Sequence, residues 1–463
     1  MTQLDTELLV ADTAPKRRRY PAYKPSGVEW LGEIPVHWEV KRIKDVTHIN
    51  TDVLRDDTDA DYTIQYIDIG NVSLQGVMAE PESLRFENAP SRARRRVNSG
   101  DTIISTVRTY LQAIAYFENP APNLVVSTGF AVLRPGNGIH PKFLYYLVRC
   151  PYFIDTVMVN SVGVSYPAIN PSMLSCLPVW IPPLPEQRAI AAYLDRETAS
   201  IDTLIDRKQR LISLLQEKRT TLISHAVTRG LDPFAPLKPS GVEWLAEIPA
   251  HWEIRRIKMV SSLITSGSRG WAAYYSEEGA IFLRIGNLTR TSIALDLTDI
   301  QHVSPPVGAE GARTRVRSGD VLTSITAYIG SVAVVKMDIG TAYVNQHIAL
   351  IRPRTNVILP EWLGYCLLSR VGSAQFGQLL YGGTKDGLGL DDVANLLILL
   401  PPMLEQCAIV QHIEEETAKI DTLIAKVRRH IAKLQEYRTA LISAAVTGKI
   451  DVTLLKESHN HES

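Results

Sequence analysis

The chain has 463 residues, more than one ordinary hydrophobic core organises, so we expect two domains with connections between them. Apolar residues make up 45% and charged residues 21% of the sequence, a globular composition that leaves disorder only for the two ends. Lysine plus arginine balance aspartate plus glutamate at 49 each, which excludes a global basic field but allows local basic patches.

The first segment, residues 1–23, is expected to be a tail. It contains the basic cluster Lys16–Arg19 but no apolar stretch before a cleavage site, so it does not resemble a signal peptide. The longest apolar run, Leu396–Leu400, is far shorter than the roughly 20 residues that cross a bilayer. The cysteines are scattered and indicate neither a disulfide framework nor a metal site. We therefore expect a soluble, cytoplasmic protein that does not contact membranes.

A repeat organises the chain. The block Lys24–Val46 returns as Lys238–Val260, with 18 of 23 positions identical and an offset of 214. A second block starts at Ile181 and returns at Leu400, at an offset of 219, with about half of its positions identical. The sequence between these blocks has diverged, which favours a variable domain followed by a shared helix, twice over.

The first variable domain, residues 24–180, is predicted to be mixed α/β. The β-branched runs Thr102–Val107 and Leu124–Leu133 predict strands, and Tyr145–Val148 predicts a short helix after Pro141. Residues 181–237 predict the first shared helix, from Pro185 to Val227. Its apolar residues recur at a heptad-like spacing: Ile190, Leu194, Ile201, Leu204, Leu211, Leu215 and Leu222.

The second variable domain, residues 238–399, repeats this pattern. Ala280–Ile285, Val321–Ile325 and Val332–Val335 predict strands, and Trp362–Leu368 predicts a short helix. The second shared helix occupies residues 400–450 and precedes a tail at 451–463. Its apolar residues lie at Ile409, Ile413, Ile420, Leu423, Leu434 and Leu441.

Two long helices with one apolar seam each most simply pack on each other as an antiparallel coiled coil. The alternative is that each helix only covers the core of its own domain. The sequence therefore predicts an α/β protein with two mixed α/β domains, separated by two long helices, and an internal pseudo-two-fold repeat.

Motifs for catalysis are missing from the sequence. It has no GxxxxGK[ST] or GxGxxG loop, no HExxH and no CxxC pair. The stretch Asn170–Ser172 lacks the aromatic residue that would stack on a flipped base. His37 and His251 each precede a tryptophan of the repeated block, where a packing role is expected. We therefore expect no catalytic residue, no metal site and no bound cofactor.

Two arginine-rich runs occupy matching places, each just before a Ser-Gly-Asp landmark, at 99–101 and 318–320. Arginine-rich loops can neutralise phosphates, and a guanidinium can recognise guanine through two hydrogen bonds. The alternative is a solvated charge run. The predicted DNA contacts are Arg92, Arg94, Arg95, Arg96, Arg313, Arg315 and Arg317.

Further loops carry side chains that can donate hydrogen bonds to phosphates or base edges. Two follow predicted strands, and two precede the long helices. The alternative is that these loops are ordinary turns. The predicted contacts in them are Arg108, Thr109, Tyr110, Tyr166, Thr326, Tyr328, Thr384 and Lys385.

Several motifs occur together and in order: the duplicated Gly-Val-Glu-Trp-Leu…Ile-Pro…His-Trp opening, the Gly-Asp landmark, and Gly383–Leu388 before the second helix. Pro182–Gln187 and Pro401–Gln406 each lead into a long helix. In this combination the chain resembles the specificity subunit of type I restriction–modification systems, over about Lys24–Lys449. Ser165–Ala168 stands where the first copy would carry the glycine-threonine loop, so the first copy departs from the pattern there.

The resemblance implies two target-recognition domains, each recognising one half of a split, non-palindromic double-stranded DNA sequence. It also implies helices that act as a ruler and dock two modification subunits, with restriction subunits joining them. S-adenosylmethionine and ATP with Mg²⁺ would belong to those partners. Two other functions are kept as alternatives: a fused DNA methyltransferase or nuclease with unrecognised motifs, and a bivalent scaffold.

Overall fold

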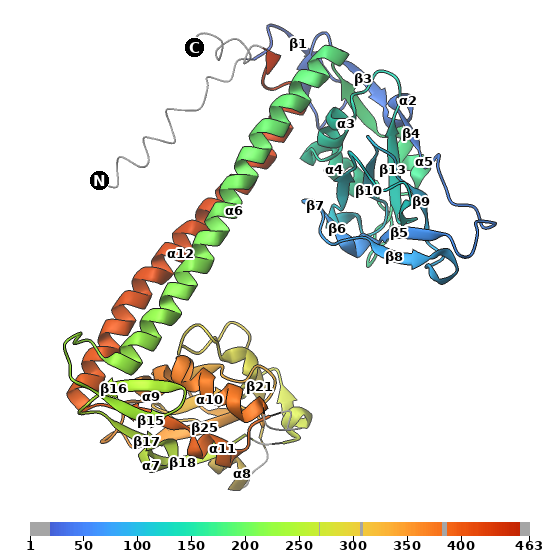
Figure 1. Ribbon diagram of the computed structural model, residues 1–463. Helices are drawn as coiled ribbons and strands as arrows, with labels where there is room; N and C mark the ends of the chain where they lie inside the picture. The colour runs from blue at the N-terminus through green and yellow to red at the C-terminus, as the bar shows by residue number, and fades with distance from the viewer. Residues whose placement is uncertain (1–18, 268, 306–308, 382–386, 454–463) are drawn as a thin grey trace. The chain divides into compact units, whose positions relative to one another are not determined.

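The computed structural model describes residues 19–453, apart from 268, 306–308 and 382–386. The chain divides into two compact units, which are called the first unit (Met1–Arg207 with His430–Ser463) and the second unit (Lys208–Arg429). Each unit contains two four-stranded sheets, several short helices and one end of each of two long helices (Figure 1). The predicted fold class is confirmed.

The first unit contains two sheets whose inner faces share one core. The antiparallel sheet has the order β11-β10-β13-β4, and the mixed sheet has the order β8-β5-β12-β9, with β12 parallel to β5. Ile103 and Val132 of the first sheet pack with Ile67 and Val126 of the second. The strands are β4 (Thr47–Ile49), β5 (Thr63–Ile67), β8 (Glu82–Arg85), β9 (Ala93–Arg96), β10 (Thr102–Ser105), β11 (Ile114–Tyr116), β12 (Leu124–Ser127) and β13 (Phe130–Pro135).

Short elements complete the first unit. Three of its helices begin with proline, whose fixed φ suits the first helical position. They are α3 (Pro141–Val148), α4 (Pro151–Val159) and α5 (Pro171–Cys176). The remaining elements are β1 (Tyr23–Pro25), β2 (Glu33–Pro35), β3 (Glu39–Arg42), α2 (Ile43–Val46), β6 (Val72–Ser73), β7 (Gly76–Val77) and β14 (Pro178–Ile181).

The second unit repeats this arrangement of two sheets, which is called the frame. Its sheets have the orders β18-β25-β22-β23 and β19-β21-β20-β24, and β20 is parallel to β24. Its sheet strands are β18 (Ser261–Ser266), β19 (Tyr275–Ser276), β20 (Ala280–Leu283), β21 (Gln301–Val303), β22 (Val321–Ser324), β23 (Val332–Val334), β24 (Ala342–Val344) and β25 (Ile348–Pro353). Its other elements are β15 (Leu237–Val242), β16 (Leu245–Pro249), β17 (Glu253–Arg256), α7 (Ile257–Val260), α8 (Ala309–Thr314), α9 (Pro360–Leu368), α10 (Arg370–Tyr381), α11 (Leu390–Asn395) and β26 (Leu397–Leu400).

Two local predictions need correction. The run Leu124–Leu133 is not one strand but two, β12 and β13, which belong to different sheets. The chain turns at Gly129, where a Cβ atom would lie 2.3 Å from the Cδ1 of Ile69, so a larger residue would require the Ile69 side chain to move. The first arginine run is also not a loop: Ala93–Arg96 forms the edge strand β9, and the second run begins with helix α8.

The long helices are α6 (Leu184–Arg229) and α12 (Met403–Val446), close to the predicted limits. In the first unit the N-terminal part of α6 shares a core with the C-terminal part of α12, through Leu194 and Ile201 with Leu441 and Ala445. In the second unit the C-terminal part of α6, including Ile223, packs in one core with the N-terminal part of α12. The two helices are therefore antiparallel, as predicted.

The seam of these helices differs from the predicted one in its middle. Leu204 and Leu211 are exposed, and so is Leu423, while Ile205 and Ile424 are buried. A coiled-coil seam advances by alternating steps of three and four residues, and a step of four from Ile201 reaches position 205. The leucines at 204 and 423 therefore face away from the seam.

Two ion pairs related by the repeat join the helices. In the first unit Arg438 on α12 pairs with Asp202 on α6, with 3.0 Å between Nε and Oδ1. In the second unit Arg219 on α6 pairs with Asp421 on α12. Both arginines and both aspartates are related by the offset of 219, so the helices carry the internal pseudo-two-fold repeat in their contacts. Across the described part of the chain, no helix is both long enough and apolar enough to cross a membrane.

Candidate nucleic-acid interface

The repeated blocks bring polar contacts to equivalent places in the two units. In the first unit Glu186 accepts hydrogen bonds from Trp38 Nε1 at 2.9 Å and contacts His37 Nε2 at 2.8 Å. In the second unit Glu405 is bonded to Trp252 Nε1 at 3.0 Å, and its second oxygen lies 2.8 Å from the Nε2 of the adjacent histidine. These contacts tie the start of each long helix to the repeated His-Trp segment, so these histidines have structural partners.

The Gly-Asp landmark anchors the central strand of each antiparallel sheet. Asp101 is buried and accepts two hydrogen bonds from Arg134, at 3.0 and 2.8 Å. Asp320 accepts the same pair from Arg352, both at 2.8 Å. This two-point contact fixes the starts of β10 and β22, whose opposite ends lead into the loops predicted to contact DNA.

The C-terminal ends of β5, β10 and β12 meet along one side of the first unit, which is called the first edge. The backbone N–H of Thr106 donates to the carbonyl of Gly129 at 2.7 Å, and Thr128 N donates to the carbonyl of Arg92 at 2.8 Å. Arg92 Nη2 in turn donates to Asp68, after β5, at 2.6 Å. These bonds place the start of the arginine run beside the loop that follows β10.

Two predicted loops come together at the first edge. The guanidinium of Arg108 lies 4.9 Å from the ring centroid of Tyr166, a cation–π contact, and Arg108 adopts a left-handed backbone with φ of 50°. Tyr166 is 64% exposed and Tyr110 is 49% exposed, so both hydroxyls can be reached from solvent. Thr109 is buried and contacts Ser161 Oγ at 2.9 Å, and so it holds the loop in place.

The arginines of β9 have partners within the first unit. Arg94 lies over Phe86, 4.7 Å from the ring centroid, and Arg96 lies 5.8 Å from the ring of Tyr62. Arg95 donates to Asn50 Oδ1 at 2.7 Å and to a backbone carbonyl, and burial lowers its pKa. Their contacts with DNA stay predictions, and Arg95 is the least available of them.

An equivalent side of the second unit, the second edge, is built from other residues. Thr326 Oγ1 lies 2.7 Å from His347 Nδ1, which fixes the loop after β22. Ala327 occupies the position of Arg108 in the repeat and shares its left-handed conformation, with φ of 52°. The next residue, Tyr328, is 69% exposed, and the guanidinium of Arg290 lies 5.8 Å from its ring centroid.

The second arginine run is less tightly held than the first. Arg313 donates to Thr265 Oγ1 and to Ser266 O. Arg315 and Arg317 are exposed, and no side-chain partner is present for them among residues that the structure describes. Thr384 and Lys385 lie outside the described residues.

Arg290 and His347 were not predicted. Arg290 lies between two threonines, three residues after an Ile-Gly-Asn tripeptide that also occurs in the first half, where Leu74 takes its place, and His347 carries no motif. Only the fold brings them to Tyr328 and Thr326. Among the residues that the structure describes, no group of three or more His, Cys, Asp or Glu is placed to hold a metal ion. Exposed guanidinium groups and tyrosine hydroxyls suit phosphates and base edges.

The two diverged α/β domains share a repeated frame, and each presents an arginine and a tyrosine at its own edge. This arrangement defines a class of proteins that recognise a target through two separate domains. The family model for the type I restriction modification DNA specificity domain matches residues 35–213 and 296–431. The chain belongs to this family, as the sequence motifs predicted.

Known relatives agree with this assignment. The chain is 23% identical to the type I restriction enzyme EcoBI specificity subunit of Escherichia coli over 315 residues, which cover 67% of this chain and 65% of that subunit. It is 25% identical to the putative type I restriction enzyme MjaX specificity subunit of Methanocaldococcus jannaschii, over 91% of this chain and 96% of that one. A chain solved in a study of complex assembly and conformational transition of the type I R-M system shares the fold. Its TM-score is 0.69 at 24% identity, over 90% of this chain and 99% of that chain.

Proposed function

We propose that this chain is the DNA-specificity subunit of a type I restriction–modification complex and that its two edges recognise different halves of a bipartite, asymmetric site. One observation carries the proposal: the same frame presents two edges whose exposed side chains differ. Arg108 with Tyr166 stands at the first edge and Arg290 with Tyr328 at the second. A chain with two different recognition surfaces suits a target with two different halves.

The chain itself is the non-catalytic member of the complex. We assign recognition to residues 24–180 and 238–399, with the helical segments 181–237 and 400–450 as the spacer between half-sites. Methylation with S-adenosylmethionine and cleavage with ATP would be carried out by partner subunits. The residues proposed to contact DNA are Arg92, Arg94, Arg95, Arg96, Arg108, Thr109, Tyr110, Tyr166, Arg290, Arg313, Arg315, Arg317, Thr326, Tyr328, Thr384 and Lys385.

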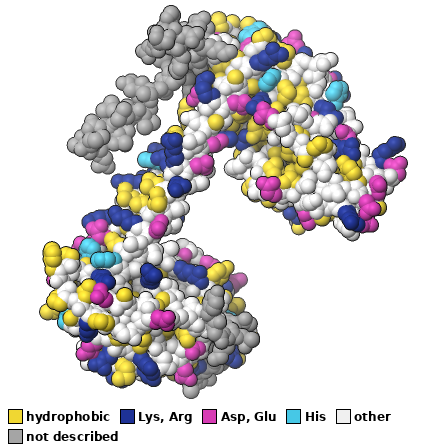
Figure 2. Space-filling model, viewed as in Figure 1, with side chains coloured by type: hydrophobic (Ala, Val, Ile, Leu, Met, Phe, Trp, Pro, Cys, Tyr) yellow, Lys and Arg dark blue, Asp and Glu magenta, His cyan; other side chains and the backbone are white. Residues whose placement is uncertain are grey.

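Two modification subunits would dock on the long helices. Leu204 of α6 and Leu423 of α12 are equivalent in the repeat, and both are exposed rather than buried in the seam. Hydrophobic side chains on the outer surface of the long helices are visible in Figure 2. Two copies of one partner can use two repeat-related surfaces, because a repeated surface offers the same contacts twice.

The charge of the chain is consistent with a partner that supplies part of the contact with DNA phosphates. Basic and acidic side chains are interspersed over the face shown in Figure 2, and the net charge is zero. The isolated chain is therefore expected to bind DNA weakly, because few phosphates are neutralised without the partner.

A domain-duplication hybrid tests the proposal. Replacing residues 238–399 with a second copy of 24–180 should give a subunit whose two edges are identical. In a host that also expresses the modification subunit, single-molecule methylome mapping should then find a palindromic target. The parent chain is the control and should give an asymmetric one. An asymmetric target for the hybrid would contradict independent recognition by the two domains. Binding of S-adenosylmethionine by the purified chain alone would favour a fused methyltransferase instead.

A further inference from the structure

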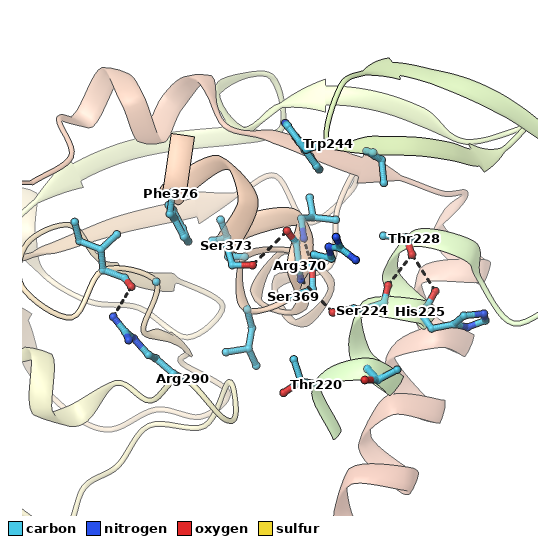
Figure 3. Close-up of a pocket in the computed structure, with 18 of the residues that line it drawn as sticks. Thr220, Ser224, His225, Thr228, Trp244, Arg290, Ser369, Arg370, Ser373 and Phe376 are labelled. Carbon is cyan, nitrogen blue, oxygen red and sulfur yellow. Dashed lines mark hydrogen bonds between the residues drawn. The ribbon is translucent and has the colours of Figure 1, made fainter. Parts of the chain in front are cut away.

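The second unit contains a cavity of about 780 Å³ that shares Arg290 and the loop after β22 with the second edge (Figure 3). Its walls come from the C-terminal part of α6, from the end of α9, from α10 and from the loop Ala327–Gly330 that follows the second edge. The volume lies within the usual range for small-molecule sites in proteins. A ligand of nucleotide size fits such a space.

Cationic and hydroxyl groups line this cavity, and no aspartate or glutamate is among its lining residues. Arg290, Arg370 and His225 are the basic side chains. The guanidinium of Arg370 has no hydrogen-bond or ion-pair partner within the described part of the chain, although its backbone N–H donates to Ser224 Oγ at 3.1 Å. Six hydroxyls surround these groups: Thr220, Thr221, Ser224, Thr228, Ser369 and Ser373. This lining suits an anion with several oxygen atoms.

In the first unit the equivalent place is occupied by a stacked pair of aromatic rings. There Tyr152 stacks on Trp30, with 6.1 Å between ring centroids and 18° between ring planes, and Lys449 donates to the tyrosine hydroxyl at 2.6 Å. In the repeat, Val371 replaces Tyr152, and Trp244, the counterpart of Trp30, lines the cavity. A cavity of the first unit that is bounded by α4 and α12 measures about 150 Å³.

The second unit therefore keeps the tryptophan but lacks the ring that covers it. We propose that this cavity binds a nucleoside phosphate, with the base against Trp244 and the phosphate beside Arg370. Base–aromatic stacking tolerates any base, and guanidinium groups are the usual partners of phosphate oxygens. Phe376 supplies a second aromatic side chain, and the hydroxyls offer partners to the ribose.

Two sources could supply this chemistry: a free nucleotide, or a nucleotide of DNA held at the second edge. The loop Ala327–Gly330 lines the cavity and also contains Tyr328 of the second edge, so either source has access. A partner-protein segment with an aromatic and an acidic side chain would meet similar charges. The hydroxyl-rich lining favours the nucleotide, and the partner segment is an outcome of the test below.

The test uses the full chain in complex with its modification subunit, and ADP, adenosine and inorganic phosphate as probes. Calorimetry should show saturable binding of ADP to the complex and at least about tenfold weaker binding of adenosine, because the charged contact is lost. The modification subunit is also measured alone, and its own ADP binding is subtracted as the background. No saturable ADP binding beyond that background would overturn the proposal.

Two variants locate the site. Arg370→Ala removes the unpartnered guanidinium and should weaken ADP binding at least about tenfold. Val371→Tyr restores the ring that fills the first unit and should also weaken it. Arg255→Ala removes an exposed guanidinium of the same unit outside the cavity and should leave ADP binding unchanged. Unchanged binding in both cavity variants would overturn the proposal.

Competition separates the two sources. A duplex carrying both half-sites should displace a fluorescent ADP analogue if DNA supplies the nucleotide, and should leave it bound if the free pool does. If instead Arg370→Ala releases the modification subunit, and ADP binds neither form, a protein segment occupies the cavity and the proposal fails. The DNA sequence that is methylated by the complex carrying Arg370→Ala reports on DNA recognition separately. The two proposals can therefore fail independently.

Discussion

In the first unit an arginine from the loop after β10 lies over Tyr166, whereas in the second unit Arg290, from a different part of the frame, lies over Tyr328. The position of Arg108 is taken by Ala327 in the second unit, yet both residues keep the same left-handed backbone. The backbone of the edge is thus shared, and the side chains on it are rebuilt. Divergence has changed the groups that face solvent and kept the contacts that hold the starts of β10 and β22.

Those retained contacts are buried and polar. The pairs Asp101–Arg134 and Asp320–Arg352 are related by the repeat and have almost the same geometry. A buried carboxylate with a two-point arginine contact leaves little freedom for the strand that carries it, because an unpaired buried charge is costly. The comparison therefore predicts large effects for substitutions in the frame and smaller, sequence-specific effects for substitutions at the edges.

The largest effect is expected from Asp101→Ala, which leaves Arg134 without its buried partner. We expect the free energy of unfolding of the first unit to fall by about 3–5 kcal/mol. Hydrogen exchange of β10 and β13 should rise, while exchange of β22 and β25 in the second unit stays as in the parent. Asp61→Ala removes an exposed partner of Arg85 and is the matched control, expected to cost at most about 1 kcal/mol. Equal effects of the two variants would contradict the role given to the buried pair.

The contact between the repeated tryptophan and the glutamate at the start of each long helix should contribute more to stability in the first unit than in the second. Glu186 accepts hydrogen bonds from Trp38 and from Tyr20 Oη, the latter at 2.5 Å, whereas no tyrosine bonds to Glu405 in the described part of the second unit. Glu186→Ala should therefore destabilise its unit more than Glu405→Ala does, by about 1 kcal/mol for the additional hydrogen bond. Urea unfolding followed by tryptophan fluorescence measures both. A larger loss for Glu405→Ala would reverse the comparison.

The edges can be tested one half-site at a time. Arg108→Ala and Arg290→Ala should each relax recognition at one half of the target and leave the other half intact. A loss of about 1–3 kcal/mol of discrimination is expected if the guanidinium contacts a base, and a uniform loss of affinity if it contacts a phosphate. Methylome mapping of each variant gives the affected half. Relaxation of both halves by one substitution would contradict the separation of the edges.

The sequence predicted the frame better than the edges, for physical reasons. Long helices have a period that repeated leucines and isoleucines display over many turns, and β-branched runs mark strands. The seam position was wrong at Leu204 because a run of adjacent apolar residues, Leu204 and Ile205, offers two choices that only packing decides. Arg290 could not be found because its pairing with Tyr328 joins residues that are 38 positions apart in the chain.

The smallest expected difference is in the loss of stability when one or the other ion pair between the long helices is removed. Asp202→Ala and Asp421→Ala each remove an exposed carboxylate, so each should cost no more than about 1–2 kcal/mol. The side chain of Arg219 is 8% exposed and that of Arg438 is 19% exposed, so the guanidinium left behind by Asp421→Ala is the less hydrated of the two. Asp421→Ala should therefore be the more destabilising variant, as measured by thermal unfolding, although both pairs descend from one repeated position. The same loss in both variants, or a larger one for Asp202→Ala, would mean that burial of the arginine does not set the cost.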